Sequence, residues 1–162
     1  MTSERRLSEL RGPEARRAID GCYRAMERGR ASSYQVRLAL RCEPSPEMGE
    51  FDRFLANRDP LVRGAAARVL AKWSPEKVVK AILEEKDSSA LAAMLQALGD
   101  AGHSGVDDLT PLLRRDDMLA EKAFQMFVRV GRADLLFTLA MGDDDITTER
   151  VRRYLNEQGW LD

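Results

Sequence analysis

The stretch Asp59-Pro-Leu-Val-Arg-Gly-Ala-Ala-Ala-Arg-Val-Leu70 contains the features that decide the fold of this chain. Asp59 can accept hydrogen bonds from the free N–H groups of a first helical turn. Pro60 follows at the first helical position, where the missing N–H costs nothing. Apolar residues then recur at i, i+3 and i+4, as on the buried face of a helix. The stretch therefore predicts an amphipathic helix that begins just after Asp59.

The same pattern, an aspartate followed by apolar residues at helical spacing, recurs in residues 87–98, 116–127 and 144–155. Successive segments therefore start 28, 29 and 28 residues apart. We expect Asp87, Asp116 and Asp144 to cap these helices as Asp59 caps the first. Gly102, Gly131 and Gly159 follow three of them and suit a left-handed C-terminal cap. The alignment predicts three core columns: Leu70, Leu98, Phe127 and Leu155; Ala66, Met94, Ala123 and Val151; and Val69, Ala97, Met126 and Tyr154.

A second, shorter helix is predicted before each of these segments. Pro75 and Pro111 are expected near the start of two of them, where proline is tolerated. The apolar residues that mark the four short helices are Phe51, Phe54 and Leu55; Val79, Ile82 and Leu83; Leu109, Leu112 and Leu113; and Leu135, Leu136 and Leu139. The unit is thus helix, turn, helix, turn in about 28 residues, and stacking of units would bury faces that no single helix can bury alone.

The chain before residue 44 is less regular. Residues 13–28 and 33–42 each predict a helix, the first with Ala15, Ala18, Ile19, Cys22 and Met26 on one face. We interpret residues 1–43 as a divergent N-terminal repeat and cap, and residues 44–162 as four repeats of 28–29 residues in the same domain. Trp160 and Leu161 are expected to fold back over the last helix. The predicted fold is all-α, an α-α superhelix (solenoid) of about five helical hairpins.

The segment that begins at Asp59 resembles the second helix of a HEAT repeat, and most closely the short HEAT-like repeats of phycocyanobilin-lyase relatives. The residues that carry the resemblance are Asp59, Val62, Arg63 and the alanines 65–67. The resemblance covers residues 48–158 and implies a ladder of Asp and Arg hydrogen bonds between neighbouring turns. Leu91, Ala120 and Thr148 stand where later units would need the arginine, so only the first unit matches fully. Repeats of this type serve many functions, and the resemblance names none of them.

Composition and charge narrow the class of protein. The chain has 162 residues, 44% of them hydrophobic and 33% charged, which fits one domain with a continuous core. It has no long apolar run of the kind that spans a membrane and no apolar leader at its start, so we expect a cytoplasmic protein without a membrane partner. Residues 1–42 carry ten arginines and five acidic residues, a net charge of +5, whereas residues 43–162 carry −6. The basic first quarter could face an acidic partner or nucleic acid, or could simply be solvated.

Few residues are candidates for chemistry. His103, the only histidine, is predicted in a loop between repeats and lacks partners for a triad or metal site. Cys22 and Cys42 lie on apolar faces of different predicted helices, which favours buried thiols. The run 143–145 of three aspartates could bind a hard cation, but capping of the next helix explains it as well. We therefore predict no catalytic residue, no metal and no cofactor.

The face of each second helix opposite its apolar column is the better candidate for binding. Counted at 100° per residue, this face passes through Gly64, Arg68 and Lys72; Ala92, Gln96 and Asp100; Glu121, Gln125 and Arg129; and Glu149, Arg153 and Glu157. We predict that it is the concave side of the superhelix and that a partner contacts Arg68, Lys72, Gln96, Gln125, Arg129 and Arg153. The competing surface is the N-terminal unit, with Arg5, Arg6, Arg16, Arg17, Arg24 and Arg28.

The predicted function is that of a non-enzymatic scaffold or adaptor that binds another protein. The first alternative is a nucleic-acid-binding HEAT-like protein, against which stand the acidic charge of residues 43–162 and the few aromatics for base stacking. The second is a lyase or chaperone-like protein acting on a chromophore-bearing partner, which rests on the resemblance alone. The identity of the partner and the oligomeric state do not follow from the sequence.

Overall fold

The computed structural model describes residues 13–36, 51–143 and 145–161, and this part of the chain is helical without a β-strand. The all-α prediction is therefore confirmed for these residues. Every described helix is too short or too polar to span a lipid bilayer. The elements are α2 (Pro13–Glu27), η2 (Phe51–Ala56), α4 (Pro60–Leu70), α5 (Pro75–Glu84), α6 (Ser88–Ala101), η3 (Asp107–Arg114), α7 (Met118–Arg129), α8 (Ala133–Ala140) and α9 (Ile146–Glu157).

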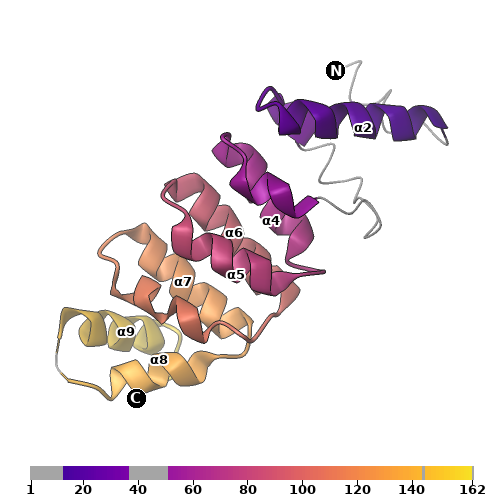
Figure 1. The fold of residues 1–162 in the computed structure, drawn as a ribbon. Helices are drawn as coiled ribbons and strands as arrows, with labels where there is room; N and C mark the ends of the chain where they lie inside the picture. The colour runs from indigo at the N-terminus through magenta and orange to yellow at the C-terminus, as the bar shows by residue number, and fades with distance from the viewer. Residues whose placement is uncertain (1–12, 37–50, 144, 162) are drawn as a thin grey trace.

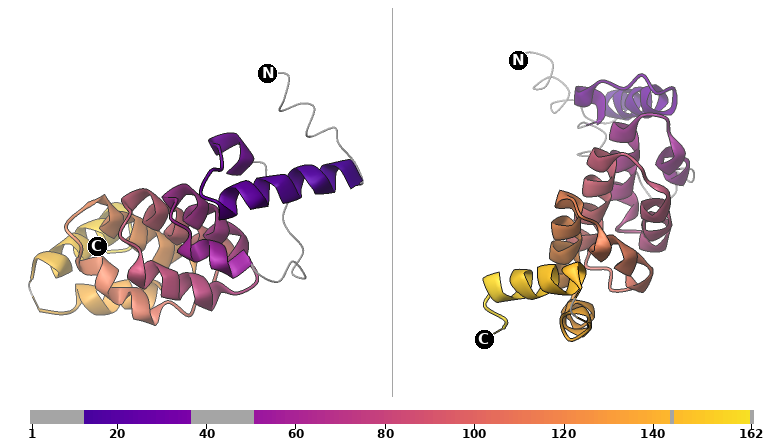
Figure 2. Two further views of the ribbon diagram at one scale, coloured as in Figure 1. Left: turned by 45° about the horizontal axis from the view of Figure 1, so that its top comes forward. Right: turned by 90° about the vertical axis from the view of Figure 1, so that its left-hand side faces the viewer.

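The helices are arranged in successive pairs along the molecule (Figure 1). We call η2, α5, η3 and α8 the first helices and α4, α6, α7 and α9 the second helices. The second helices pack in chain order, with the most extensive contacts between α4 and α6 and between α6 and α7. Helix α2 lies at one end of the array and α9 near the other (Figure 2).

The predicted core columns lie at the centre of this packing. Leu98, Phe127 and Leu155 are fully buried, and Leu70 is 5% exposed. The column one turn earlier, formed by Ala66, Met94, Ala123 and Val151, is fully buried as well. The residues between the two columns, which are Val69, Ala97, Met126 and Tyr154, are also buried. The 28–29-residue register deduced from the sequence is thus confirmed at every column position.

The aspartate caps follow the prediction in the first two second helices only. The carboxylate of Asp59 accepts a hydrogen bond from the N–H of Leu61, and that of Asp87 accepts one from Ala90, both at 2.9 Å. The prediction that Asp116 caps α7 is wrong, because Asp117 does so. Asp145 caps α9, and the predicted cap Asp144 lies outside the described residues. Two or three aspartates stand side by side at both places, and the helix begins one residue later relative to its core column.

The C-terminal ends of the helices follow the glycine prediction. Gly102, Gly131 and Gly159 have φ of 68°, 78° and 74°, a backbone conformation that glycine adopts without strain. After α7 the N–H of Gly131 donates to the carbonyl of Val128 and that of Arg132 donates to Phe127, which is a Schellman motif. Gly29, which the sequence analysis did not single out, ends α2 in the same way.

The first helices differ from expectation in two respects. Helices η2 and η3 are 3₁₀ rather than α, and Pro111 lies inside η3 rather than near its start. Proline has no N–H for an α-helical bond and restricts the preceding residue, which accounts for the change in η3. In α5 the buried side chains are Val78, Val79 and Ile82, whereas Leu83, one of the apolar residues that mark this helix in the sequence, is 52% exposed.

The two ends of the chain are covered in different ways. Helix α2 matches the predicted 13–28 within one residue and buries Cys22 and Met26. A further helix begins at residue 33, and residues 37–42 of its predicted span, with Cys42, lie outside the described residues. Trp160 stacks on Phe137 of α8, with ring centroids 6.0 Å apart, and Leu161 lines a hollow together with Arg153 and Asn156 of the last helix.

We expect Leu98→Ala to lower the free energy of unfolding by about 2–5 kcal/mol, because it removes a fully buried side chain and leaves a cavity. Urea denaturation followed by circular dichroism measures the change. Leu83→Ala is the matched control and should change stability little, since Leu83 is about half exposed. Equal midpoints for Leu98→Ala and the unmodified protein would contradict the assigned register.

Candidate functional site

The second helices expose polar side chains at equivalent positions. We call this surface, formed by the exposed residues of α4, α6, α7 and α9 at the predicted ladder positions, the second-helix face. All six side chains predicted to bind a partner are exposed on it, namely Arg68, Lys72, Gln96, Gln125, Arg129 and Arg153. Four acidic residues, Asp100, Glu121, Glu149 and Glu157, are exposed among them. The face therefore carries both signs of charge.

Two residues that the sequence predicts on this face, Gly64 and Ala92, are not exposed. Gly64 is buried because α6 approaches α4 closely there, and a Cβ at position 64 would lie 3.0 Å from that of Ala93. Ala92 is half-buried and packs against the core. Counting residues around one helix places its own faces correctly, but it does not reveal how near the next helix lies.

Arg129 and Gln96 are engaged within the molecule. The guanidinium of Arg129 in α7 forms an ion pair with Asp100 of α6. Gln96 donates from Nε2 to the same carboxylate at 3.1 Å. The Arg129 side chain also lies over Gly99, where a Cβ would meet its Cδ at 3.5 Å. These contacts join α6 to α7 across the second-helix face, so a partner would have to displace or extend them.

Arg68 and Arg153 differ from Arg129 because they form no ion pair within the described residues. Both are exposed, and neither forms an ion pair with any residue in the described ranges. Arg153 lines a hollow of about 790 Å³ between α8 and α9, in which charged residues such as Glu149 stand beside apolar ones such as Phe137. Arg152 is tied to α8 through a 2.7 Å hydrogen bond from Nε to the carbonyl of Ala140. No pattern within a single helix indicates this hollow, since it depends on how the last two helices cross.

A groove of about 410 Å³ lies at the second-helix face over α4 and beside α6. Its α4 side is formed by Leu61, Gly64, Ala65 and Arg68, spaced i, i+3, i+4 and i+7 and therefore on one helix face. The described residues that complete it are Val36, Asp59, Pro60, Asp87, Ser89, Ala90, Ala93, Gln96 and Ala97. The groove thus has a lining of small apolar residues, with Arg68 towards one end and two capping aspartates at the other.

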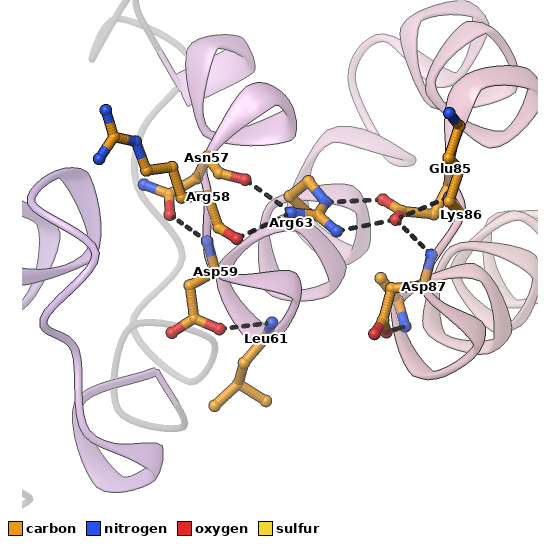
Figure 3. Close-up of polar contacts among 9 residues, drawn as sticks. Asn57, Arg58, Asp59, Leu61, Arg63, Glu85, Lys86 and Asp87 are labelled. Carbon is orange, nitrogen blue, oxygen red and sulfur yellow. Dashed lines mark hydrogen bonds and ion pairs between the residues drawn. The ribbon is translucent and has the colours of Figure 1, made fainter.

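An arginine–glutamate pair fixes the two turns beside this groove (Figure 3). Arg63 donates from Nε and Nη2 to the two carboxylate oxygens of Glu85, at 2.7 and 2.8 Å, and from Nη1 to the carbonyl of Asn57 at 2.8 Å. Glu85 also accepts the N–H of Asp87 at 3.0 Å. Arg63 therefore links the turn before α4 to the turn before α6. The resemblance implied an aspartate ladder, but the arginine's partner in the neighbouring turn is Glu85.

This pair is partly shielded from water, and its charges are mutually stabilised. The side chain of Glu85 is only 4% exposed. Its hydrogen bonds from Arg63 hold the pKa of the carboxyl below its ordinary value, and the same bonds raise the pKa of Arg63. Both groups therefore stay charged at neutral pH, and the contact is structural.

The residues that the sequence offers as candidates for catalysis or metal binding, Asp145 and His103, lie apart in the structure, at the start of α9 and in the loop after α6. Asp145 accepts the N–H of Thr148 at 2.7 Å, and this hydrogen bond is the main cause of its lowered pKa. His103 lies half-buried in the loop after α6. No group of three or more potential metal ligands occurs within residues 13–36, 51–143 and 145–161.

The aspartates and arginines with shifted pKa values are shifted in the direction that favours their charged forms. Asp107 is lowered chiefly by hydrogen bonds from Arg132, and Asp117 by those from Arg115. A general acid or base needs a pKa near the working pH, which requires shifts in the opposite direction for carboxyl groups. These ion pairs hold turns together and do not prepare proton transfer.

No protein-family model matches the chain, and the searches of curated proteins and solved structures found no significant match.

We expect Glu85→Gln to lower the free energy of unfolding at neutral pH by about 1.5–3 kcal/mol, the range for a hydrogen bond to a charged group. Because the folded protein lowers the pKa of Glu85 below its ordinary value near 4.5, this contribution is present above that pH and is lost as the pH falls through the folded pKa. The stability difference between the two proteins should therefore shrink in acid.

Denaturation at a series of pH values measures this difference, and Glu84→Gln, which alters the exposed neighbouring glutamate, is the control. A difference that stays constant from neutral pH into acid would show that the Arg63–Glu85 pair does not stabilise the fold.

Proposed function

We propose that the chain is an α-α solenoid of short HEAT-like hairpins that acts as a non-enzymatic adaptor and binds another protein on its second-helix face. The observation that carries the proposal is the exposure of polar side chains at equivalent positions of the second helices. Equivalent positions of α4, α6, α7 and α9 expose polar side chains beside a groove of about 410 Å³ with a small apolar lining. Stacked repeats commonly bind their partners on extended surfaces of this kind.

The charge of the face supports a protein partner over nucleic acid. Arg68, Lys72, Arg129 and Arg153 are balanced by four exposed acidic residues on the same face. A phosphate backbone is bound by Lys and Arg side chains that release counterions, and each carboxylate nearby opposes such binding. Protein interfaces, in contrast, combine apolar contacts with hydrogen bonds and charges of both signs.

The test is capture of partners from a lysate of the native cells, with the full chain as bait and mass spectrometry as the readout. The unmodified chain is compared with the double variant Arg68→Glu/Arg153→Glu, whose two positions are exposed and form no ion pair with a described residue. We expect the variant to lose the specific partner while its circular dichroism spectrum and melting temperature are unchanged.

The matched comparison is the triple reversal Arg17→Glu/Arg24→Glu/Arg28→Glu, in α2 and the turn that follows it, which probes the competing N-terminal surface through three exposed arginines. Arg5 and Arg6 of that surface lie outside the described residues, and so does the side chain of Arg16. Loss of the partner in the α2 variant alone would place binding on the N-terminal unit and contradict the proposal.

We further expect no tight binding of the full chain to single-stranded or duplex oligonucleotides. Fluorescence anisotropy at about 50 mM and about 200 mM salt measures it, because binding through phosphates weakens steeply over this range. Strong binding at low salt with a steep loss at high salt would favour the nucleic-acid alternative and contradict the adaptor proposal.

A further inference from the structure

We propose that the groove over α4 receives a short amphipathic helix of the partner, which places an apolar side chain on the small residues of the groove and a carboxylate on Arg68. This inference rests on the proposed function, because it specifies which part of the second-helix face the partner occupies and what the partner presents there. The partner helix also carries a basic residue at its other end, beside Asp59 and Asp87.

The shape of the groove provides the first argument. Gly64 and Ala65 lie in the middle of its α4 side, and Ala93 lies across from them on α6. The longer side chains of Leu61 and Arg68 stand one turn away on either side along α4. Leu61 is 47% exposed, so a partner could bury further apolar surface on it. The close contact of Gly64 with Ala93 closes the floor of the groove, and an apolar side chain of a partner can lie over this contact, between Leu61 and Arg68.

The backbone provides the second argument, which favours a helix over an extended segment. The groove is lined by α4 and α6, whose backbone N–H and C=O groups are largely bonded within their own helices. An extended peptide would find few backbone partners there and would leave its own polar groups unpaired against alanine side chains. A helix satisfies its backbone internally and presents side chains only, as in other helix-in-groove complexes.

The charges at the two ends provide the third argument. Asp59 and Asp87 each use Oδ1 to cap a helix, and their other carboxylate oxygens receive no hydrogen bond from a described residue. Figure 3 shows Arg58 and Lys86 pointing away from these two carboxylates, and the charge of Arg63, which is paired with Glu85, acts on both. At the other end Arg68 has no ion-pair partner among the described residues.

Pro60 and Arg68 are eight residues apart on α4, which corresponds to about 12 Å or roughly two helical turns. The complementary partner helix therefore carries a basic and an acidic residue about seven or eight positions apart, with apolar residues between them on the same face.

A peptide display library tests this pattern without knowledge of the natural partner. The probe is a library of helical peptides of roughly 15 residues, about four turns, randomised on one face and selected against the full chain. We expect the enriched peptides to share the predicted pattern of a basic residue, apolar residues and an acidic residue.

Three variants of the chain locate the binding site of the enriched peptides. Ala93→Leu fills the groove and should weaken binding by about tenfold or more, and Arg68→Glu should do the same while favouring peptides whose acidic residue is changed to lysine. Lys80→Glu, at an exposed position of α5 outside both the groove and the second-helix face, should leave the affinity unchanged. Arg68 is exposed, so its variant decides the question even if Ala93→Leu does not fold.

Failure to enrich any peptide, or enriched peptides that bind Ala93→Leu and Arg68→Glu as tightly as the unmodified chain, would overturn the groove proposal. The proposed function would still stand if the captured protein partner depended on Arg68 and Arg153. Absence of both the peptides and a captured partner would overturn both proposals.

Discussion

The burial of equivalent apolar columns between neighbouring second helices is the constraint on which the rest of the structure depends. Met94 and Leu98 of α6 are fully buried one turn apart, and so are Ala123 and Phe127 of α7. Because the same positions point inward in every second helix, the positions opposite them face outward at a regular spacing. The core thus determines both the order of packing and which polar side chains share a surface.

Within this regular scheme the junction of α4 and α6 is unusual. Gly64 in the middle of α4 costs about 0.5–1 kcal/mol relative to alanine in helix propensity, yet its lack of a side chain allows the close contact with Ala93. The Arg63–Glu85 pair joins the turns that lead into the same two helices. The relative position of α4 and α6 is thus fixed by the Gly64–Ala93 contact in the middle of the helices and by the Arg63–Glu85 ion pair at their N-terminal ends. This position determines the form of the groove between them.

The sequence predicted the columns well because apolar spacing along one helix reports directly on its buried face. The sequence was less reliable where two neighbouring residues could both cap a helix, as with the adjacent aspartates 116 and 117. It also failed where the outcome depended on a second segment. Gly64 belongs to the outward face of its own helix by angle alone, but α6 covers it. The groove and the Glu85 partner of Arg63 depend on two helices together, so no pattern within a single repeat predicted them.

The exposed residues of the second-helix face would not contribute equally to the binding of a partner. Arg129 is already paired with Asp100, so an anionic group of a partner would have to compete with this carboxylate. The net gain would be only the difference in free energy between the new ion pair and the existing one. Arg68 has no such competitor in the described residues and stands beside apolar surface that association would dehydrate. An ion pair gains strength when water is excluded around it, provided that both charges are matched. We therefore expect most of the binding energy on this face to come from contacts with α4. Helix α7 would contribute less, because its arginine is already paired and serves mainly to hold α6 and α7 together.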